Sequence, residues 1–262
     1  MDIKTLHKKE NKLTFLIKGT NPAFVNTLRR IITSEVPTIA IRRVTFVKNN
    51  SALFDEIIAH RLGMVPLVTD LDYVLPEKCS CKGSGCAKCQ VVITLKAEGP
   101  ITVYSSDLKS QDPRIQPVYG KMPIIKLLKG QELEFEAVAT LGTGKEHAKF
   151  SPGLAYYKGY PKITLDKVKN VDEVIKSCPV NVFEGKGKKL EVVNLEACIL
   201  CMACVDISDP SEAIKVEASE KDFIFTLESW GKLSPEQILA TSLDVLDDKL
   251  DEFSTELAKI KE

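Results

Sequence analysis

The stretch from Asn21 to Pro66 constrains the fold most, because its apolar spacing changes from helix to strand and back. The segment NPAFVNTLRRIITSEVP predicts a helix over residues 21–36, since Asn21 can cap the free amides of the first turn and Pro37 ends it. The apolar face of this helix is formed by Phe24, Leu28, Ile31 and Ile32. A β-branched strand over residues 41–46 follows.

The segment LFDEIIAHRLGMVPL predicts a second, shorter helix, with acidic residues in its first turn and Gly63 past its end. We expect its apolar side chains to face inward, namely Phe54, Ile57, Ile58 and Leu62. Strands are predicted over residues 13–17, 91–97, 101–106, 131–141 and 223–227. In the fourth of these, alternate apolar and acidic residues predict one buried and one solvent-facing side.

A long amphipathic helix is predicted from Ser234 to the end of the sequence. Ser234-Pro235-Glu236-Gln237 has the pattern of a capping box with proline at the first helical position. The apolar residues then recur at steps of four and three, as in a heptad seam about 40 Å long at 1.5 Å per residue. The seam consists of Leu239, Leu243, Leu246, Leu250, Phe253, Leu257 and Ile260.

The eight cysteines fall into two groups of four, which are Cys79, Cys81, Cys86 and Cys89, and Cys178, Cys198, Cys201 and Cys204. In a reducing compartment such clustering favours metal ligation over a disulfide framework. In the second group, three thiolates at steps of three can bind one iron–sulfur cluster. Cys178, of the Cys178-Pro179 pair, either supplies the fourth ligand of a [4Fe-4S] cluster or stands off from a [3Fe-4S] cluster. The spacing predicts a [4Fe-4S] or a [3Fe-4S] cluster, and zinc is the alternative.

The positions that would bind a second cluster of the bacterial ferredoxin type carry other residues. Ser208 stands four residues after Cys204, and valines occupy positions 168, 171 and 174. We therefore expect a single cluster. For the first group, CSCKGSGCAKC, Gly83 and Gly85 would permit the tight turn that a zinc site needs, and two disulfides are the alternative.

The charges balance, with 36 basic and 36 acidic side chains, so little or no direct contact with nucleic acid is expected. No signal peptide and no apolar run of about 18 residues is present, which indicates a cytoplasmic protein without a membrane span. The three histidines lie far apart in sequence, and no nucleophile, phosphate-loop or magnesium motif is found. We expect no catalytic residues in this chain.

The order LRRIITSEVPTIAI, then DEIIAHRLGMVPL, resembles the signature of alpha-type subunits of DNA-directed RNA polymerases, in the archaeal D-type form that carries a ferredoxin-like iron–sulfur domain. GTGKEHAKFSPG and FTLESWGKLSPEQIL are also similar to that family. The resemblance implies a heterodimer with subunit L, on which the small subunits N and P and the large catalytic subunits assemble. The expected dimer interface comprises Phe24, Leu28, Ile31, Ile32, Leu239, Leu243, Leu246, Leu250, Phe253 and Leu257.

The expected architecture is α+β. Residues 1–40 and 220–262 would form a split dimerisation domain with an antiparallel sheet and two long helices. Residues 41–165 would form an inserted mostly-β domain with the cysteine loop 79–89, and residues 166–219 a ferredoxin-like iron–sulfur module. Two other classes are compatible with parts of the sequence: a ferredoxin-type electron-transfer protein, and a zinc-dependent nucleic-acid-binding module.

Overall fold

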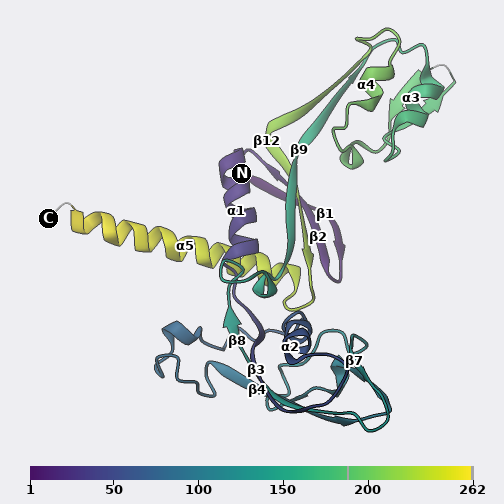
Figure 1. Cartoon of the computed structure of the whole chain (residues 1–262). Coiled ribbons are helices and arrows are strands. Elements are labelled where there is room, and N and C mark those ends of the chain that lie inside the picture. Colours follow the sequence, from purple (N-terminus) through teal and green to yellow (C-terminus); the bar gives the residue numbers. More distant parts are fainter. Residues whose placement is uncertain (188, 261–262) are drawn as a thin grey trace. The chain divides into compact units, whose positions relative to one another are not determined.

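The computed structural model describes residues 1–187 and 189–260, and it divides into two compact units (Figure 1). The first unit comprises residues 1–8, 13–27 and 156–226, and the second comprises residues 9–12, 28–155 and 227–262. Helices and antiparallel strands occur together in the chain, which confirms the α+β class. The division into two units does not test the three predicted domains, which remain a prediction.

One four-stranded sheet has the order β1-β2-β12-β9. Its strands are β1 (Asp2–Lys9), β2 (Lys12–Lys18), β9 (Gly153–Leu165) and β12 (Ile214–Ser229). β2 and β12 confirm the strands expected at 13–17 and 223–227, whereas β1 was not predicted because almost all of its residues are exposed. Phe15 of β2 stacks on Phe225 of β12 with ring centroids 5.2 Å apart, which anchors the sheet core.

A small module in the first unit is built from short elements. They are α3 (Val171–Ser177), β10 (Phe183–Lys186), β11 (Lys189–Val192), the 3₁₀ turn η4 (Leu195–Ala197) and α4 (Ala203–Ile207). β10 and β11 form an antiparallel hairpin in which Phe183 pairs with Val192. Because each element is short, the module depends on a common hydrophobic cluster that also includes cysteine side chains.

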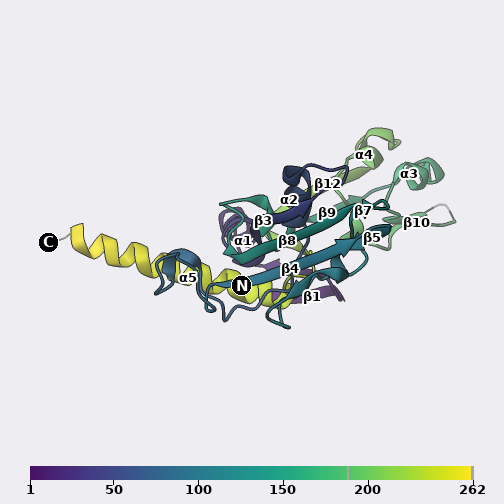
Figure 2. The same ribbon diagram turned by 60° about the horizontal axis from the view of Figure 1, so that its bottom comes forward.

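The second unit contains a sheet of order β3-β8-β4-β6, formed by β3 (Thr38–Asn49), β8 (Glu132–Gly142), β4 (Gln90–Glu98) and β6 (Lys109–Ser110). Figure 2 shows β3, β8 and β4 side by side. A separate pair consists of β5 (Ile101–Tyr104) and β7 (Pro123–Leu127), and the 3₁₀ turns are η1 (Pro76–Lys78), η2 (Ser105–Asp107) and η3 (Ala148–Phe150). The predicted alternation in β8 is confirmed, because Leu133, Phe135 and Ala137 are buried and the intervening glutamates are not.

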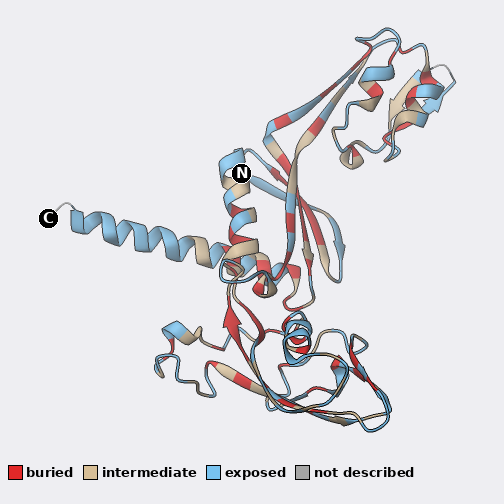
Figure 3. Cartoon of the chain, in the orientation of Figure 1, coloured by how far each residue is buried: buried red, intermediate tan, exposed pale blue. Residues whose placement is uncertain are grey.

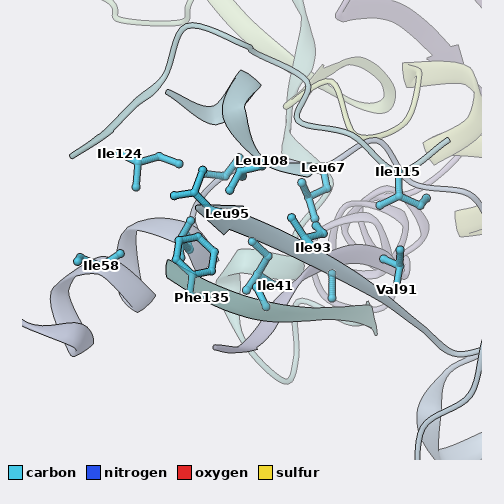
Figure 4. Close-up of a cluster of buried hydrophobic side chains, with 14 of the residues drawn as sticks. Ile41, Ile58, Leu67, Val91, Ile93, Leu95, Leu108, Ile115, Ile124 and Phe135 are labelled. Atoms are coloured by element: carbon cyan, nitrogen blue, oxygen red, sulfur yellow. The ribbon is translucent and has the colours of Figure 1, made fainter. Parts of the chain in front are cut away.

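Helix α2 (Asp55–Gly63) covers the core of this unit, and Figure 4 shows Ile58 in the same cluster as Phe135, Ile41 and Ile93. Ile58 and Leu62 are fully buried as predicted. The inward position predicted for Phe54 and Ile57 is wrong, since Phe54 is 79% and Ile57 47% exposed. The helix begins only at Asp55, so Phe54 precedes its first turn, and nine residues present just one narrow stripe to the core.

Helix α1 (Pro22–Ser34) begins as predicted, with the Phe24 N–H donating to Asn21 Oδ1 at 2.9 Å. Helix α5 (Pro235–Ile260) has the predicted capping box: the Gln237 N–H donates to Ser234 Oγ at 3.2 Å, and the Ser234 N–H donates to Gln237 Oε1 at 2.9 Å. No helix in the described residues is long and apolar enough to cross a membrane.

Candidate functional site

The first cysteine group lies in a loop between η1 and β4, and all four of its sulfur atoms lie within 4.8 Å of one another. The Sγ–Sγ distances are 3.5 Å for Cys79 and Cys86, 3.5 Å for Cys81 and Cys89, and 3.8 Å for Cys86 and Cys89. Four thiolates bound tetrahedrally at about 2.3 Å from zinc would lie about 3.8 Å apart. The loop therefore has the dimensions of a single-ion site.

The backbone of this loop explains how four close cysteines converge. Gly83 and Gly85 have φ values of 82° and 95°, in the left-handed region that favours glycine, as the sequence predicted. The Cys86 N–H donates to the Cys89 sulfur at 3.4 Å. Cys79 and Cys89 are buried and Cys81 and Cys86 half-buried, so the site is shielded but has one accessible side.

Electrostatics in the loop favour a thiolate at one position. A backbone hydrogen bond from Gly85 makes the largest contribution to lowering the pKa of Cys81 to about 6, whereas burial raises the pKa of Cys89 to about 12. All four thiols are free, and sulfurs 3.5 Å apart are far beyond the roughly 2.05 Å of a disulfide. The donor set fits a divalent ion with a preference for sulfur.

The second cysteine group lies in the small module, where Cys198 and Cys204 are buried in its hydrophobic cluster and Cys178 packs against that cluster. Cys178 caps the end of α3, Cys204 lies in α4, and Cys201 is exposed. The pKa of Cys204 is raised mainly by burial. The charge of Cys198 raises it further, and the charges of Cys201 and Cys178 make smaller contributions in the same direction. The four thiols are thus close enough to interact.

This group is wider than the first. All four cysteines belong to the described residues, and their sulfurs are not gathered within 4.8 Å of one another as those of the first group are. A cluster places several iron atoms between its thiolates and needs a wider arrangement. The Val182 N–H donates to the Cys178 sulfur at 3.4 Å, the kind of hydrogen bond that tunes cluster thiolates.

The loop between Cys198 and Cys204 has a strained backbone. Leu200 and Met202 have φ values of 58° and 63°, which residues with side chains rarely adopt. Leu200 and Val205 pack against the hydrophobic cluster of the module. Ile199 and Met202 are exposed, so they do not shield the second cysteine group from solvent. Packing therefore holds the strained backbone at Leu200 but not at Met202.

Lys158 of β9 hydrogen-bonds to the loop that precedes and includes Cys198. The sequence did not predict this contact. Its Nζ donates to the carbonyl oxygens of Glu196 at 2.7 Å and of Cys198 at 2.6 Å. Burial lowers the pKa of Lys158. No sequence signal marks the residue, because it lies on a strand forty positions before Cys198.

The positions that would serve a second cluster are filled by packing. Val168, Val171 and Val174 are buried in the hydrophobic cluster of the module. The Ser208 hydroxyl donates to the Val205 carbonyl at 2.9 Å and is itself buried. The three valines thus make apolar contacts and Ser208 makes a hydrogen bond, and the expectation of a single cluster remains a prediction.

The predicted interface residues separate into two sets. Leu28, Ile31 and Ile32 of α1 are buried within this chain, so they are core residues and cannot form a partner surface as predicted; Phe24 is half-buried. Ile238, Ser242 and the half-buried Val245 face the chain along α5, and Lys249 forms an ion pair with Glu35 at 3.5 Å. Each seam residue from Leu239 to Leu250 directly follows one of these chain-facing residues. The seam therefore lies on the helix surface next to the chain-facing side of α5.

The seam is exposed along the last half of α5 (Figure 3). Leu239 and Leu246 are half-buried. The exposed fractions of the others are 41% for Leu243, 54% for Leu250, 65% for Phe253, 43% for Leu257 and 80% for Ile260. Large apolar side chains in a continuous row on one helix face are typical of a protein interface.

Residues 41–153 match the RNA polymerase Rpb3/RpoA insert domain, which includes the β3-β8-β4-β6 sheet and the first cysteine group. The fold thus carries the insert domain of an alpha-type RNA polymerase subunit. The chain is similar along nearly its whole length to subunit Rpo3 of DNA-directed RNA polymerase from three archaea. It is 43% identical to that of Methanosphaera stadtmanae, 39% to that of Archaeoglobus fulgidus and 39% to that of Pyrococcus furiosus.

The alignments cover 96% of both chains for Methanosphaera, 99% of both for Archaeoglobus, and 99% of this chain and 98% of the relative for Pyrococcus. The chain belongs to the Rpo3 family of DNA-directed RNA polymerase subunits. It is therefore a component of the transcription machinery.

Proposed function

We propose that this subunit is a non-catalytic assembly platform, which pairs with subunit L and then receives subunits N and P and the large catalytic subunits. The exposed apolar seam on the last half of α5 carries the proposal. Family membership supplies the context of a multisubunit enzyme, and the seam supplies a surface that needs a partner. The balanced net charge supports a role in protein contacts rather than in binding nucleic acid.

The pairing surface is centred on α5. Fully burying an exposed Leu or Phe side chain contributes about 1.5–3 kcal/mol, so four seam residues together supply a gain of the same order as the cost of association. The apolar face of helix α1 is already covered within the chain, so the proposed surface lies on α5. A partner that presents a similar apolar helix would cover Leu250, Phe253 and Leu257.

Co-expression with subunit L tests the pairing. Phe253→Asp should weaken the heterodimer by at least a hundredfold, because a carboxylate would be buried without a cation. Thr255→Asp is the matched control, since it adds the same charge on the opposite face of the same exposed turn and should change the affinity less than threefold. Equal affinities for the two variants would exclude the seam as the interface.

The Cys79–Cys89 loop is proposed to hold one structural zinc ion through all four thiolates. Support comes from the sulfur distances, the donor set and the tight glycine turns. The ion would crosslink the loop to the start of β4. Zinc analysis of the purified protein tests this, and two disulfides found by thiol titration would contradict it.

The second group is proposed to hold one iron–sulfur cluster through Cys178, Cys198, Cys201 and Cys204, in a structural or assembly-related role. Support comes from the ferredoxin spacing, the width of the site and the strained loop. A ferredoxin-type electron-transfer protein would also contain such a cluster, but the similarity to polymerase subunits extends over nearly the whole chain. Protein purified without oxygen should be brown and contain acid-labile sulfide.

A further inference from the structure

A pocket in the second unit has no role in the proposals above. It has a volume of about 240 Å³ and lies between the end of α2, η3 and the turn before α5. Its lining consists of Met64, Pro66, Tyr119, Met122, Ala148, Lys149, Ser151, Trp230 and Lys232. Most of this lining is apolar, and its charged members are the two lysines.

The two lysines are held by neutral oxygen atoms. Lys232 Nζ donates to the Lys149 carbonyl and to Thr38 Oγ1, the latter at 3.3 Å, and Lys149 Nζ donates to the Ile41 carbonyl at 2.9 Å. In the described part of the chain, no carboxylate lies within ion-pairing distance of either ammonium group. Since an ammonium has three donors, both lysines retain hydrogen-bonding capacity.

The environment disfavours positive charge at this point. Lys232 is only 5% exposed, and burial, with the nearby charge of Lys149, lowers its pKa to about 8. Burial and then the charge of Arg42 lower the pKa of Lys149. An incoming carboxylate would offset both effects, because an opposite charge favours the protonated form of a lysine.

The rim of the pocket has the composition of a protein interface. Met64 is 53% exposed, Tyr119 46% and Trp230 46%, and these residue types are enriched at the centres of interfaces. The volume is below the range of about 300–1,000 Å³ that is typical of pockets for small molecules. It is large enough for one or two side chains, which favours a segment of a protein over a separate ligand.

We propose that this pocket receives an acidic side chain of another polymerase subunit, with its carboxylate on Lys232 and Lys149 and adjacent apolar residues on Met64, Tyr119 and Trp230. The inference rests on the proposed platform role, because it needs a partner other than subunit L. It extends that role by assigning a second docking surface, separate in sequence from the α5 seam, and the charge of the segment that it binds.

The test uses the co-expressed heterodimer with subunit L and the remaining polymerase subunits. Lys232→Met keeps the apolar stem but removes the charge, and it should weaken binding of the heterodimer to the remaining subunits at least tenfold. Lys129→Met, which removes an exposed lysine elsewhere in the same unit, should change that binding less than twofold. Pairing with subunit L should be the same for both variants, so a failure of the pocket is distinguishable from a failure of the platform role.

A second measurement does not depend on the folding of a variant. In the assembled wild-type enzyme, a carbodiimide should join Lys232 or Lys149 to an aspartate or glutamate of another subunit. The amine nitrogen attacks the activated carboxyl carbon, an amide bond forms, and the water that is lost converts the reagent to a urea. Binding of Lys232→Met within twofold of the wild type would overturn the proposal. So would the absence of such a crosslink from both lysines while other lysines of the chain are crosslinked.

Discussion

The two cysteine groups have the same four-thiol composition but differ in how the chain brings them together. Cys79, Cys81, Cys86 and Cys89 are adjacent in sequence, and a glycine turn gathers their sulfurs within 4.8 Å. The other group joins a contiguous loop to a distant cysteine through the hydrophobic cluster of the small module. A local turn thus defines a site of single-ion size, whereas a wider site depends on the packing of a whole module.

The largest expected effect is on the wide site, formed by Cys178, Cys198, Cys201 and Cys204. Cys201→Ser should remove the iron–sulfur cluster and unfold the small module, because a domain of this size has little core of its own and its cluster contributes folding energy. Hydrogen exchange should show loss of protection across residues 166–219. Ile199→Ser, an exposed position in the same loop, is the control and should retain both colour and protection. A protected module without a cluster would contradict the dependence on the cluster.

Loss of a ligand from the narrow site, formed by Cys79, Cys81, Cys86 and Cys89, should have a more local effect. Cys89→Ser should release zinc and increase hydrogen exchange in the loop and the first residues of β4, while the hydrophobic core that includes Phe135 stays protected. Lys88→Ser, at the exposed neighbouring position, should keep the metal. Unfolding of the β3-β8-β4-β6 sheet in Cys89→Ser would show that the Cys79–Cys89 site stabilises its whole unit, as the second cysteine group is expected to stabilise the small module. That result would contradict the proposed difference between the two sites.

Buried lysines provide a test through pH. The pKa of Lys232 is about 8 in the folded chain and about 10.4 in an unfolded one, so between these values only the unfolded chain binds the proton. The free energy of unfolding should therefore rise by about 3 kcal/mol in total between about pH 8 and about pH 10.4. Below about pH 8 the destabilisation caused by burying the protonated Lys232 should be constant. Urea unfolding of the wild type and of Lys232→Met from pH 7 to 10.5 measures it. Parallel stability curves would show that Lys232 is not desolvated.

The smallest expected effect is at Lys158. Lys158→Met removes two hydrogen bonds from an ammonium to loop carbonyls and should destabilise the module by about 1–3 kcal/mol. The cluster should be lost faster in air, whereas zinc in the other group should be unaffected. Lys162→Met, at an exposed position on the same strand, is the control. Identical rates of cluster loss in the two variants would exclude a role for Lys158.

Sequence reasoning was strongest where a local pattern decides the structure. The caps at Asn21 and Ser234 and the alternation in β8 follow from neighbours along the chain, and all three were predicted. It failed where burial depends on distant partners. Phe54 and Ile57 are apolar yet exposed, because α2 offers only one narrow face to the core, and Leu28 is covered by the chain itself rather than by a partner.

The candidate sites show the same division. Spacing alone identified both cysteine groups as candidate ligands, and the four sulfurs of the first group do lie within 4.8 Å of one another. Lys158 and Lys232 could not, because each contacts carbonyl groups or side chains far away in the sequence, and nothing in the local pattern marks a buried lysine. Likewise, the pocket of Lys232 is assembled from segments around residues 64, 119, 149 and 230, which only folding brings together.

The central claim is that the chain holds two metal centres of different kinds, and metal and sulfide analysis of the heterodimer purified without oxygen tests it most directly. The wild type should contain one zinc ion and one iron–sulfur cluster per chain. Cys89→Ser should lose only zinc, and Cys201→Ser should lose only iron and sulfide. Zinc in both groups without sulfide, or loss of both metals from either variant, would contradict the account.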